Sequence, residues 1–419
     1  MAAQVGTRDR GAFGLDLSAL RDRRLLRVVL AQLASMAGDF MVLASLPFAV
    51  LSIGGSINQV GLALAVQGVV LAALLLFGGA IADRVSRRSV VVAADLLRFG
   101  SQAALAVLLI AGTAELWQLL VAQAVLGAGM AFFMPAMNGL VPQAVPAERL
   151  QQANALRGIA ASAAAVVGPA IAAVALASAE PGWAFGIDAL TFLVSAALVA
   201  GLRLPAGDHA EDGAQSVLAD VIEGWAEFRR RTWLWVIVAK SALLNALVFA
   251  PFFVFGPTVA ADSLGGPGAW AIILAAMGLG ELLGGLIAMS WRPARPLVAA
   301  TLVIGLWTAP LLLLATLAPV GLVAAGAAAA GGALAVSAAL WETALQSRVP
   351  TTMRSRLSSY DLFGSLALVP IGYLLAGLLQ GSIGMEPSLI AAAVIIAAAT
   401  SIVIAVPSVR SPTPVETDR

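Results

Sequence analysis

The sequence predicts an all-α integral membrane protein in which twelve transmembrane helices form two six-helix bundles, and three observations lead to this fold class. Hydrophobic residues make up 60% of the 419 residues and charged residues only 11%, whereas soluble domains contain about 25% charged residues. The apolar residues fall into twelve runs of about twenty residues, the length of a helix that crosses a bilayer. The second half of the chain also repeats features of the first half.

The first half of the chain begins with a polar and basic stretch. We expect residues 1–24 to form a cytoplasmic tail without a cleaved signal peptide, because no apolar core with a small-residue cleavage site comes before the first span. The N-terminal bundle covers residues 25–202. Its predicted spans are 25–53, 59–82, 89–111, 116–141, 150–177 and 183–202.

A polar segment, residues 203–231, separates the two bundles and is expected to be a cytoplasmic loop. The C-terminal bundle covers residues 232–406. Residues 407–419 are rich in Pro, Ser and Thr, which predicts a disordered cytoplasmic tail. The predicted spans of the second bundle are 233–259, 269–291, 296–317, 320–346, 357–379 and 387–406.

The arginines predict the orientation of the chain. The loops after the second, fourth, sixth, eighth and tenth spans all contain Arg, whereas the alternate loops contain none. Short loops rich in Lys and Arg face the cytoplasm. The sequence therefore predicts that both termini are cytoplasmic and that the protein lies in the inner (cytoplasmic) membrane of the cell.

Composition excludes several other functions. The net charge of +1 gives no footprint for nucleic acid. The chain has no Cys, and its only His, His209, lies in the polar central segment, so we expect no metal site and no cofactor. A phosphate-binding loop of the ATPase type is absent, which leaves the proton gradient as the expected energy source. No nucleophile–base–acid pattern indicates an enzyme.

The chain contains an internal repeat that predicts two related halves. Residues 284–288, at the end of the eighth span, match residues 78–82 at the end of the second span. An Arg-bearing turn follows in both places. Such a repeat is typical of a transporter whose two halves rock around a central site.

The turn between the second and third spans carries a spaced motif that consists of Gly79, Asp83, Arg84, Arg87 and Arg88. This motif resembles the signature of the major facilitator superfamily, although Ser86 stands where that family usually has a second Gly. The resemblance implies that Asp83 meets the N-terminus of the eleventh helix and holds the halves together when the cytoplasmic side is closed.

Other segments resemble one branch of this family. Gly168 and Pro169 in the fifth span resemble the antiporter motif of its exporters, although four positions that are often Gly are Ala here. Residues 142–156, 95–98 and 188–192 resemble the enterobactin-exporter and macrolide-efflux branch, also called transmembrane secretion effectors. Gln123 stands where many proton-coupled members have Arg.

Two carboxyl groups lie deep within predicted spans, where ionisable groups are costly and usually functional. Asp39 is near the middle of the first span, with no basic residue nearby in the sequence, so we expect a carboxyl away from cations that loads and releases a proton. A hydrogen-bonded structural Asp is the alternative. Glu281, in the eighth span, has the same two interpretations.

The other charged residues in the spans have structural interpretations beside the functional ones. Asp95 and Arg98 are three residues apart on one helical face and can pair. We expect Arg157 to face an acidic residue and Asp361 to meet the signature turn. These four residues are predicted to form a supporting network.

Three further residues are predicted as coupling or substrate candidates. Lys240, the only lysine, either extends its ammonium towards the interface or pairs with a carboxylate across the central cleft. Asp188 is expected near the outer face as a gate. Glu342 lies near the cytoplasmic end of the tenth span.

The central cleft is predicted to be mostly apolar, which suits a bulky amphipathic substrate. The lining candidates are Phe40, Phe132, Phe253 and Trp341, together with Phe48, Phe133, Asn138, Phe249, Phe252, Trp270 and Trp307.

We therefore predict a monomeric secondary transporter that exports hydrophobic or amphipathic small molecules, such as drugs or siderophores, in exchange for protons. Two alternatives stay open. One is a transporter of the same fold that takes up nutrients or lipids. The other is a membrane protein without transport activity that senses a ligand or binds a partner.

Overall fold

The computed structural model describes residues 22–146, 149–178, 180–202, 225–349 and 351–410, except for the side chains of residues 76–84, 151, 155, 177–178, 346, 351–352, 354–356 and 358–359. These residues form helices and connecting turns, with no strand in the described ranges. Twelve helices are long and apolar enough to cross a membrane, which confirms the predicted number of spans.

The first half contains six uninterrupted spans, and their ends lie within three residues of the predicted positions. Their length follows from the bilayer, where every backbone amide and carbonyl has to be hydrogen-bonded within the helix. The helices are α1 (Arg23–Ser52), α2 (Ile57–Arg84), α3 (Arg87–Ile110), α4 (Leu116–Ala144), α5 (Leu150–Ser178) and α6 (Gly182–Ala200).

In the second half, three spans are not the continuous α-helices that were predicted. The seventh consists of α8 (Thr232–Leu244), the π-helical η3 (Asn245–Phe249) and α9 (Ala250–Ser263). The ninth consists of α11 (Pro296–Val303), the 3-10 segment η4 (Ile304–Trp307) and α12 (Thr308–Ala315). The eleventh consists of α14 (Thr351–Leu366) and α15 (Val369–Ser382), which are separated by a turn.

The other elements of the second half are α10 (Pro267–Ser290), α13 (Val320–Arg348), α16 (Met385–Ala405) and the short α17 (Pro407–Arg410). The prediction of disorder is wrong for residues 407–410, because α17 buries Val409 against the bundle. Residues 225–230 are helical as well, and Phe228 packs against Tyr360 of α14. His209 of the central segment lies outside the described residues. The same holds for residues 1–21 and 411–419 of the two predicted tails.

The same helix pairs pack in both halves, which confirms the internal repeat. In the first half, α1 packs with α5, α2 with α4, and α3 with α6. The corresponding pairs six spans later are the α8–α9 span with α14–α15, α10 with α13, and α12 with α16. Small residues permit the close approach within these pairs. A Cβ atom at Gly284 of α10 would overlap the backbone of Gly332 in α13.

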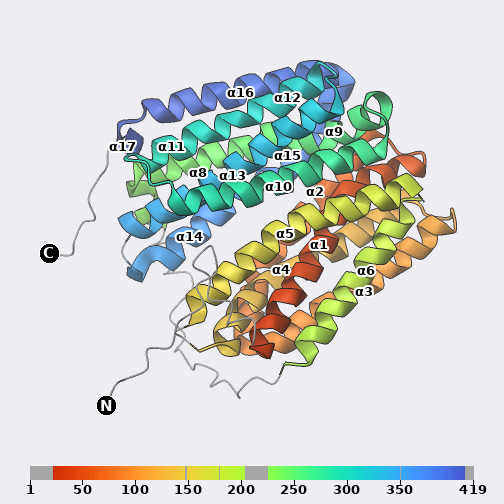
Figure 1. The fold of residues 1–419 in the computed structure, drawn as a ribbon, viewed down its shortest axis with the longest axis horizontal. Coiled ribbons are helices and arrows are strands. Elements are labelled where there is room, and N and C mark those ends of the chain that lie inside the picture. The colour runs from red at the N-terminus through yellow and green to blue at the C-terminus, as the bar shows by residue number, and fades with distance from the viewer. Residues whose placement is uncertain (1–21, 147–148, 179, 203–224, 350, 411–419) are drawn as a thin grey trace, which may run out of the picture.

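The two halves meet along two seams, which are also related by the repeat. Helix α5 packs against α10, and α2 packs against α15 (Figure 1). Gly278 of α10 lies against the carbonyl of Ala165 in α5, near the middle of both helices. A Cβ atom at Gly61 would lie 2.5 Å from the carbonyl oxygen of Tyr373, close to the start of α2.

The contacts between the halves favour one end of the molecule. The α2–α15 seam includes Asn58, next to the start of α2, and Gly377 in the last turns of α15. Because each span crosses the bundle, these positions are at the end where the Arg-free loops lie. At the opposite end, α14 packs with α8 and α13 of its own half. The halves are therefore packed together in the middle and at the Arg-free end.

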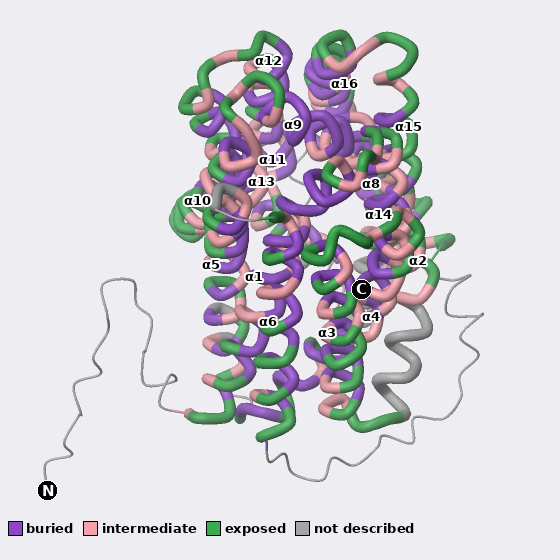
Figure 2. Tube along the Cα trace, turned by 90° about the vertical axis from the view of Figure 1, so that its right-hand side faces the viewer, coloured by how far each residue is buried: buried purple, intermediate pink, exposed green. Residues whose placement is uncertain are grey.

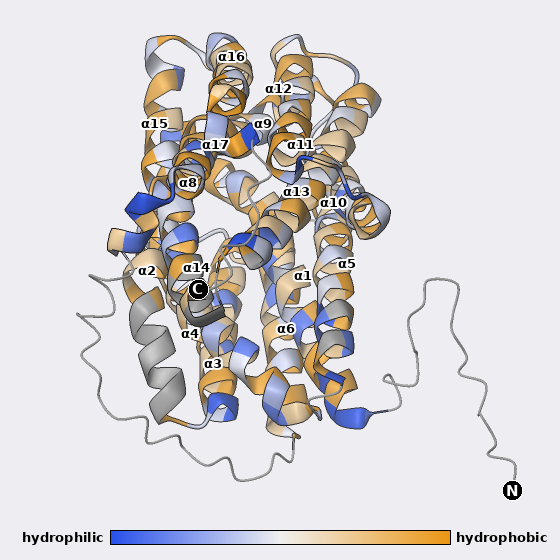
Figure 3. Ribbon diagram, turned by 90° about the vertical axis from the view of Figure 1, so that its left-hand side faces the viewer, coloured by the Kyte–Doolittle hydropathy of each residue, from blue (hydrophilic) through white to orange (hydrophobic). Residues whose placement is uncertain are grey.

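The burial pattern is that of a bundle surrounded by lipid. The spans α1 and α8–α9 are the most buried, and Figure 2 shows long buried stretches in both. Figure 3 shows hydrophobic residues along the helices, and many large ones are nevertheless exposed. Val107, Val174 and Ile402 are 67%, 68% and 67% exposed. Soluble proteins seldom expose large contiguous apolar patches to water. The exposed apolar residues therefore indicate a surface that faces lipid.

Candidate functional site

A buried group of four charged residues lies inside the first half. We call Asp39, Asp95, Arg98 and Asp188, from α1, α3 and α6, the Arg98 cluster. Arg98 is fully buried, and its guanidinium forms a close ion pair with Asp95 one helical turn away. Its Nη1 lies 3.6 Å from Oδ2 of Asp39, and its Nη2 donates a hydrogen bond of 3.2 Å to the hydroxyl of Ser35.

Aromatic rings hold the guanidinium of Arg98 in place. Its Cζ lies 4.5 Å from the ring centroid of Phe133 and 4.2 Å from that of Phe192. A desolvated cation over an aromatic face is attracted by about 2 kcal/mol. Gly129 of α4 makes room for the side chain, because a Cβ atom there would lie 2.5 Å from Cγ of Arg98. The cluster is thus a fixed arrangement.

Asp188 brings a third carboxyl group to the cluster. It is fully buried on α6 and lies against Gly38 of α1, where a side chain would overlap its carboxyl oxygen. It also neighbours Gln102, and its backbone carbonyl accepts a hydrogen bond of 2.7 Å from the hydroxyl of Thr191. The structure therefore places Asp188 in the interior of the first bundle. Its predicted role as an outer gate stays a prediction.

The cluster contains three carboxyl groups and one guanidinium. One oxygen each of Asp39, Asp95 and Asp188 is buried without a hydrogen-bond partner among the described residues. A buried charge without a partner costs several kcal/mol. The cluster therefore has more carboxyl groups than cations among the described residues. The side chain of Asp39 is 21% exposed, whereas the other three members of the cluster are fully buried. Asp39 is therefore the carboxyl group of the cluster that is accessible from outside it.

Glu281 lies apart from this cluster, at the seam between the halves. It shares a small pocket with Phe40 of α1 and Pro169 of α5. Gly168 is packed tightly there, since a Cβ atom would lie 2.8 Å from Cβ of Phe40. Gly168 therefore permits a close approach of α5 to α1. Glu281 forms no hydrogen bond or ion pair with the described residues.

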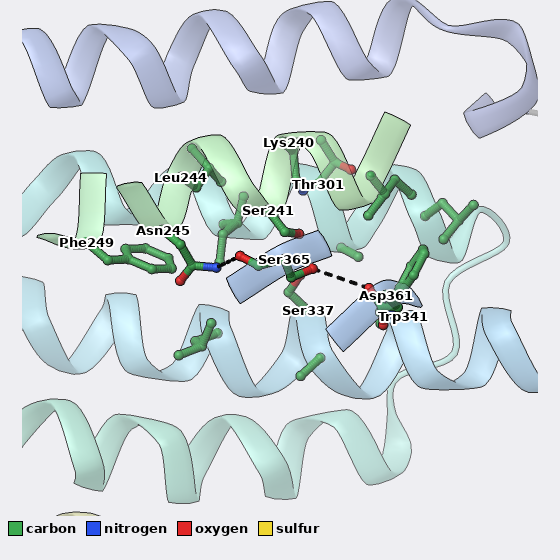
Figure 4. Close-up of a pocket in the computed structure, with 16 residues that line it drawn as sticks. Lys240, Ser241, Leu244, Asn245, Phe249, Thr301, Ser337, Trp341, Asp361 and Ser365 are labelled. Atoms are coloured by element: carbon green, nitrogen blue, oxygen red, sulfur yellow. Dashed lines mark hydrogen bonds between the residues drawn. The ribbon is translucent and has the colours of Figure 1, made fainter. Parts of the chain in front are cut away.

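A polar cavity of about 240 Å³ lies within the second half (Figure 4). We call it the Lys240 cavity. A chain of hydrogen bonds runs along its wall. Asn245 of η3 donates to the carbonyl of Ser365 at 3.0 Å, and the hydroxyl of Ser365 donates to Asp361 at 3.3 Å. The indole of Trp341 donates to the other oxygen of Asp361 at 2.7 Å.

The signature turn is described in part. Arg87 donates a hydrogen bond of 2.7 Å to the carbonyl of Gly139 on α4, and Arg88 donates to the carbonyl of Ala200 at the end of α6. These two arginines join three helices of the first half. For residues 76–84, which include Gly79, Asp83 and Arg84, the structure describes the backbone alone, so the predicted contact of Asp83 with the eleventh span stays a prediction.

Two predictions of partners are wrong. Arg157 contacts two neutral amides: its Nε donates to Gln32 at 2.5 Å and its Nη2 to Asn138 at 2.8 Å. Asp39 is not away from cations, because Arg98 reaches it from the neighbouring helix α3. In both cases the partner comes from another helix, and the sequence carries no signal for which helix faces lie together.

The other predicted residues have separate surroundings. Glu342 is exposed on α13 and does not line the Lys240 cavity, whereas Trp341 does. Phe132 packs partly buried in the first half and Phe253 in the second. Three of the candidates for the cleft lining, Phe252, Trp270 and Trp307, are buried core side chains, and the ring of Phe252 contacts both indoles. Their prediction as cleft residues is wrong.

Known proteins resemble this chain in sequence and in structure. Macrolide efflux protein A from Streptococcus pyogenes is 26% identical over 211 residues, which are 50% of this chain and 52% of that protein, so the match spans about half of this relative. Multidrug efflux pump Tap from Mycolicibacterium fortuitum is 27% identical over 384 residues, or 88% of this chain and 91% of that protein.

Solved structures share the fold. The crystal structure of the nucleoside transporter NupG superposes with a TM-score of 0.71 and 13% identity, over 91% of this chain and 98% of that one. An inward-facing, occupied bacterial homologue of the human lysosomal transporter Spinster gives 0.71 and 15% identity, over 94% and 99% of the chains. The family model described as Major Facilitator Superfamily matches residues 28–369. The chain therefore belongs to the Major Facilitator Superfamily and is a multi-pass membrane protein.

Proposed function

We propose that this transporter exports hydrophobic or amphipathic small molecules from the cytoplasm in exchange for protons. The observation that carries this proposal is the excess of carboxyl groups in the Arg98 cluster. Three carboxyl groups share one guanidinium inside the membrane, and one of the three, Asp39, is partly exposed. Such a site exchanges a proton at modest electrostatic cost, because Arg98 stabilises whichever carboxylate is left charged.

The direction of transport is supported by two relatives. Macrolide efflux protein A and the multidrug efflux pump Tap are named as exporters, and Tap matches over most of both chains. The antiporter-like Gly168 and Pro169 point the same way. The names of the two relatives, a macrolide efflux protein and a multidrug efflux pump, support a drug-like substrate class.

Alternating access is supported by the arrangement of the two halves. The Arg-bearing loops are expected in the cytoplasm, and the halves are packed together at the other end. We infer that the described arrangement is the one open towards the cytoplasm, from which substrate is loaded. Protonation of the cluster from outside and release inside would then drive the cycle.

A flux experiment tests this proposal. Cells that express the full chain are loaded with a panel of fluorescent amphipathic dyes, and efflux is followed with and without a proton uncoupler. We expect energy-dependent efflux that the uncoupler abolishes. Efflux that persists after collapse of the proton gradient would refute proton coupling, and the absence of efflux for the whole panel would favour a protein without transport activity.

Uptake of a polar nutrient is the second candidate function. The observation in its favour is the polar wall of the Lys240 cavity, with the hydroxyls of Ser241, Ser337 and Ser365 and the amide of Asn245. Accumulation of a labelled nucleoside or sugar in cells that express the chain, without any dye efflux, would support uptake.

A further inference from the structure

Lys240 lines the Lys240 cavity and forms no ion pair with any residue that the structure describes. It projects from α8, and only 7% of its surface is exposed. It forms no hydrogen bond with the described residues either. It therefore neither extends into solvent nor pairs with a carboxylate, the two roles that the sequence suggested. A buried ammonium of this kind is costly unless something pairs with it.

A second polar group in the same cavity also lacks a partner. Thr301 of α11 is 1% exposed, and its Oγ1 forms no hydrogen bond with the described residues. Lys240 and Thr301 both line the cavity, together with the hydroxyls of Ser241 and Ser337 (Figure 4). Buried polar groups are normally hydrogen-bonded. Two such groups in one cavity indicate a site that a ligand completes.

The backbone is irregular around this cavity. Three of the spans that line it depart from α-helical geometry: the π-helical η3 contributes Asn245 and Phe249, η4 contributes Ile304, and α14 ends one residue after Ser365. Short π-helical segments inside α-helices occur frequently at functional sites. The irregular segments thus coincide with the unpartnered side chains.

The volume and lining of the cavity limit what it accepts. About 240 Å³ is less than the roughly 300–1,000 Å³ of pockets that hold a whole drug-sized molecule. The cavity therefore accommodates one end of a larger ligand. Apolar side chains of Leu244, Phe249 and Leu334 lie beside the polar groups. An end that carries a charged group on an apolar body fits both parts of the lining.

The charge of that end follows from which side chains are already satisfied. Asp361, the acidic residue of the cavity, accepts hydrogen bonds from Trp341 and Ser365. The Lys240 ammonium, which can only donate hydrogen bonds, has no acceptor among the described residues. The missing partner of the cavity is therefore an acceptor with negative charge.

We propose that the Lys240 cavity is a subsite that binds an oxyanion, such as a carboxylate, sulfonate or phosphate, at one end of an amphipathic molecule. The Lys240 ammonium forms the ion pair, the Thr301 hydroxyl donates a hydrogen bond, and the apolar lining contacts the adjoining rings or chain. The inference rests on the proposed function, since it assigns a chemical class to the exported substrate.

Equilibrium binding to the purified full chain in a non-ionic detergent tests the subsite. The probes are naphthalene-2-carboxylate, its neutral isostere 2-naphthamide and the cation 2-naphthylmethylamine. Wild-type protein is expected to bind the carboxylate best. Lys240→Met keeps the length of the side chain but removes its charge, and should weaken carboxylate binding roughly tenfold to hundredfold, the range of a hydrogen bond to a charged group. Binding of the amide should not change.

Matched variants separate recognition from loss of structure. Lys240→Arg keeps the cation and should retain the preference for the carboxylate. Arg230→Met removes one positive charge at an exposed site, where the side chain is 80% exposed, and should bind like wild type. Thr301→Val has nearly the same shape and should weaken the carboxylate severalfold, which gives a second test if Lys240→Met does not fold.

Two results would overturn the proposal: equal affinity of the wild type for carboxylate and amide, or tighter binding of the cation that Asp361→Asn abolishes. Binding in detergent needs no proton gradient, so it is independent of the flux experiment. Lys240-dependent binding with uncoupler-resistant efflux would refute proton coupling alone.

The oxyanion has two possible sources, a dissolved substrate or a lipid headgroup. Competition with phosphatidylglycerol in nanodiscs distinguishes them, with phosphatidylcholine as the control. Displacement of the carboxylate probe by phosphatidylglycerol assigns the subsite to a lipid, and its absence assigns it to a soluble substrate. Both results support an oxyanion site.

Discussion

The guanidinium of Arg98 lies 3.6 Å from the carboxylate of Asp39, across the boundary between α3 and α1. The same guanidinium forms a closer ion pair with Asp95 on its own helix. Arg98 therefore has one tight partner and one looser partner. The looser one is also the partly exposed carboxyl of the cluster, and this difference is the basis of the first prediction.

Asp39→Asn should uncouple transport from the proton gradient. The amide keeps the shape of the side chain but cannot exchange a proton, whereas Asp95 still compensates Arg98. We expect reconstituted vesicles to lose accumulation driven by a pH gradient and to retain downhill exchange of substrate. Glu281→Gln should have the same effect only if both carboxyl groups carry protons, and a milder one if Glu281 orients substrate. Full gradient-driven transport by Asp39→Asn would exclude Asp39 as an essential carrier.

Arg98→Met should destabilise the protein strongly. Removal of one partner of a buried ion pair costs about 3–5 kcal/mol, and here three carboxyl groups would lose the one cation that the described residues place beside them. Thermal unfolding in detergent should show a clear drop in Tm. The double variant Arg98→Met with Asp95→Asn should recover part of the loss, because it also removes the closest buried carboxylate. A double variant no more stable than the single one would contradict this electrostatic account.

Two neighbouring glycines of α10 should differ in their tolerance of a methyl group. A Cβ atom at Gly284 would overlap the backbone of Gly332, whereas a Cβ atom at Gly285 has no neighbour within 4 Å. Gly284→Ala should therefore lower stability by about 1–3 kcal/mol through overpacking. Gly285→Ala should be neutral or raise stability by up to about 1 kcal/mol, since Ala favours helix. Equal melting temperatures would show that α10 and α13 are less tightly packed.

The orientation of the chain can be read from cysteine labelling, because the sequence has no cysteine of its own. Ser86 lies in the signature turn and Ser263 at the end of α9, and both are exposed. With Arg-bearing loops in the cytoplasm, Ser86→Cys should resist an impermeant thiol reagent in intact cells, and Ser263→Cys should react. Permeabilised cells supply the control, in which both should react. The reverse pattern would place both termini outside.

The sequence predicts the fold far better than it predicts the candidate site. Length and hydropathy define the spans, and the repeat defines the two halves, because both are properties of continuous segments. The partners of Asp39 and Arg157 depend instead on how each helix is rotated about its axis. A membrane helix is apolar towards lipid as well as towards its neighbours, so periodicity does not indicate the inward face. For the same reason Trp270 and Trp307 were predicted to line a cleft although they lie in the core.

The irregular segments η3 and η4 were also beyond prediction. Residues 245–249 are ordinary helix-compatible residues with no internal Pro or Gly, and nothing in their composition indicates a π-helix. Asn245 and Phe249, the two end residues of η3, line the Lys240 cavity. Lys240 itself was identified because it is the only lysine, yet its lack of a partner could be known only from the arrangement around it.

The seams between the halves have a mechanical consequence. At Gly278 and Gly61 the backbone of one helix lies directly against the backbone of another, with no side chain inserted between them. Interlocking side chains would have to leave their rotamers before two helices could slide past each other. Direct backbone contacts lack that obstacle. We therefore expect α5 to slide along α10, and α2 along α15, without changes of side-chain rotamer at these glycines.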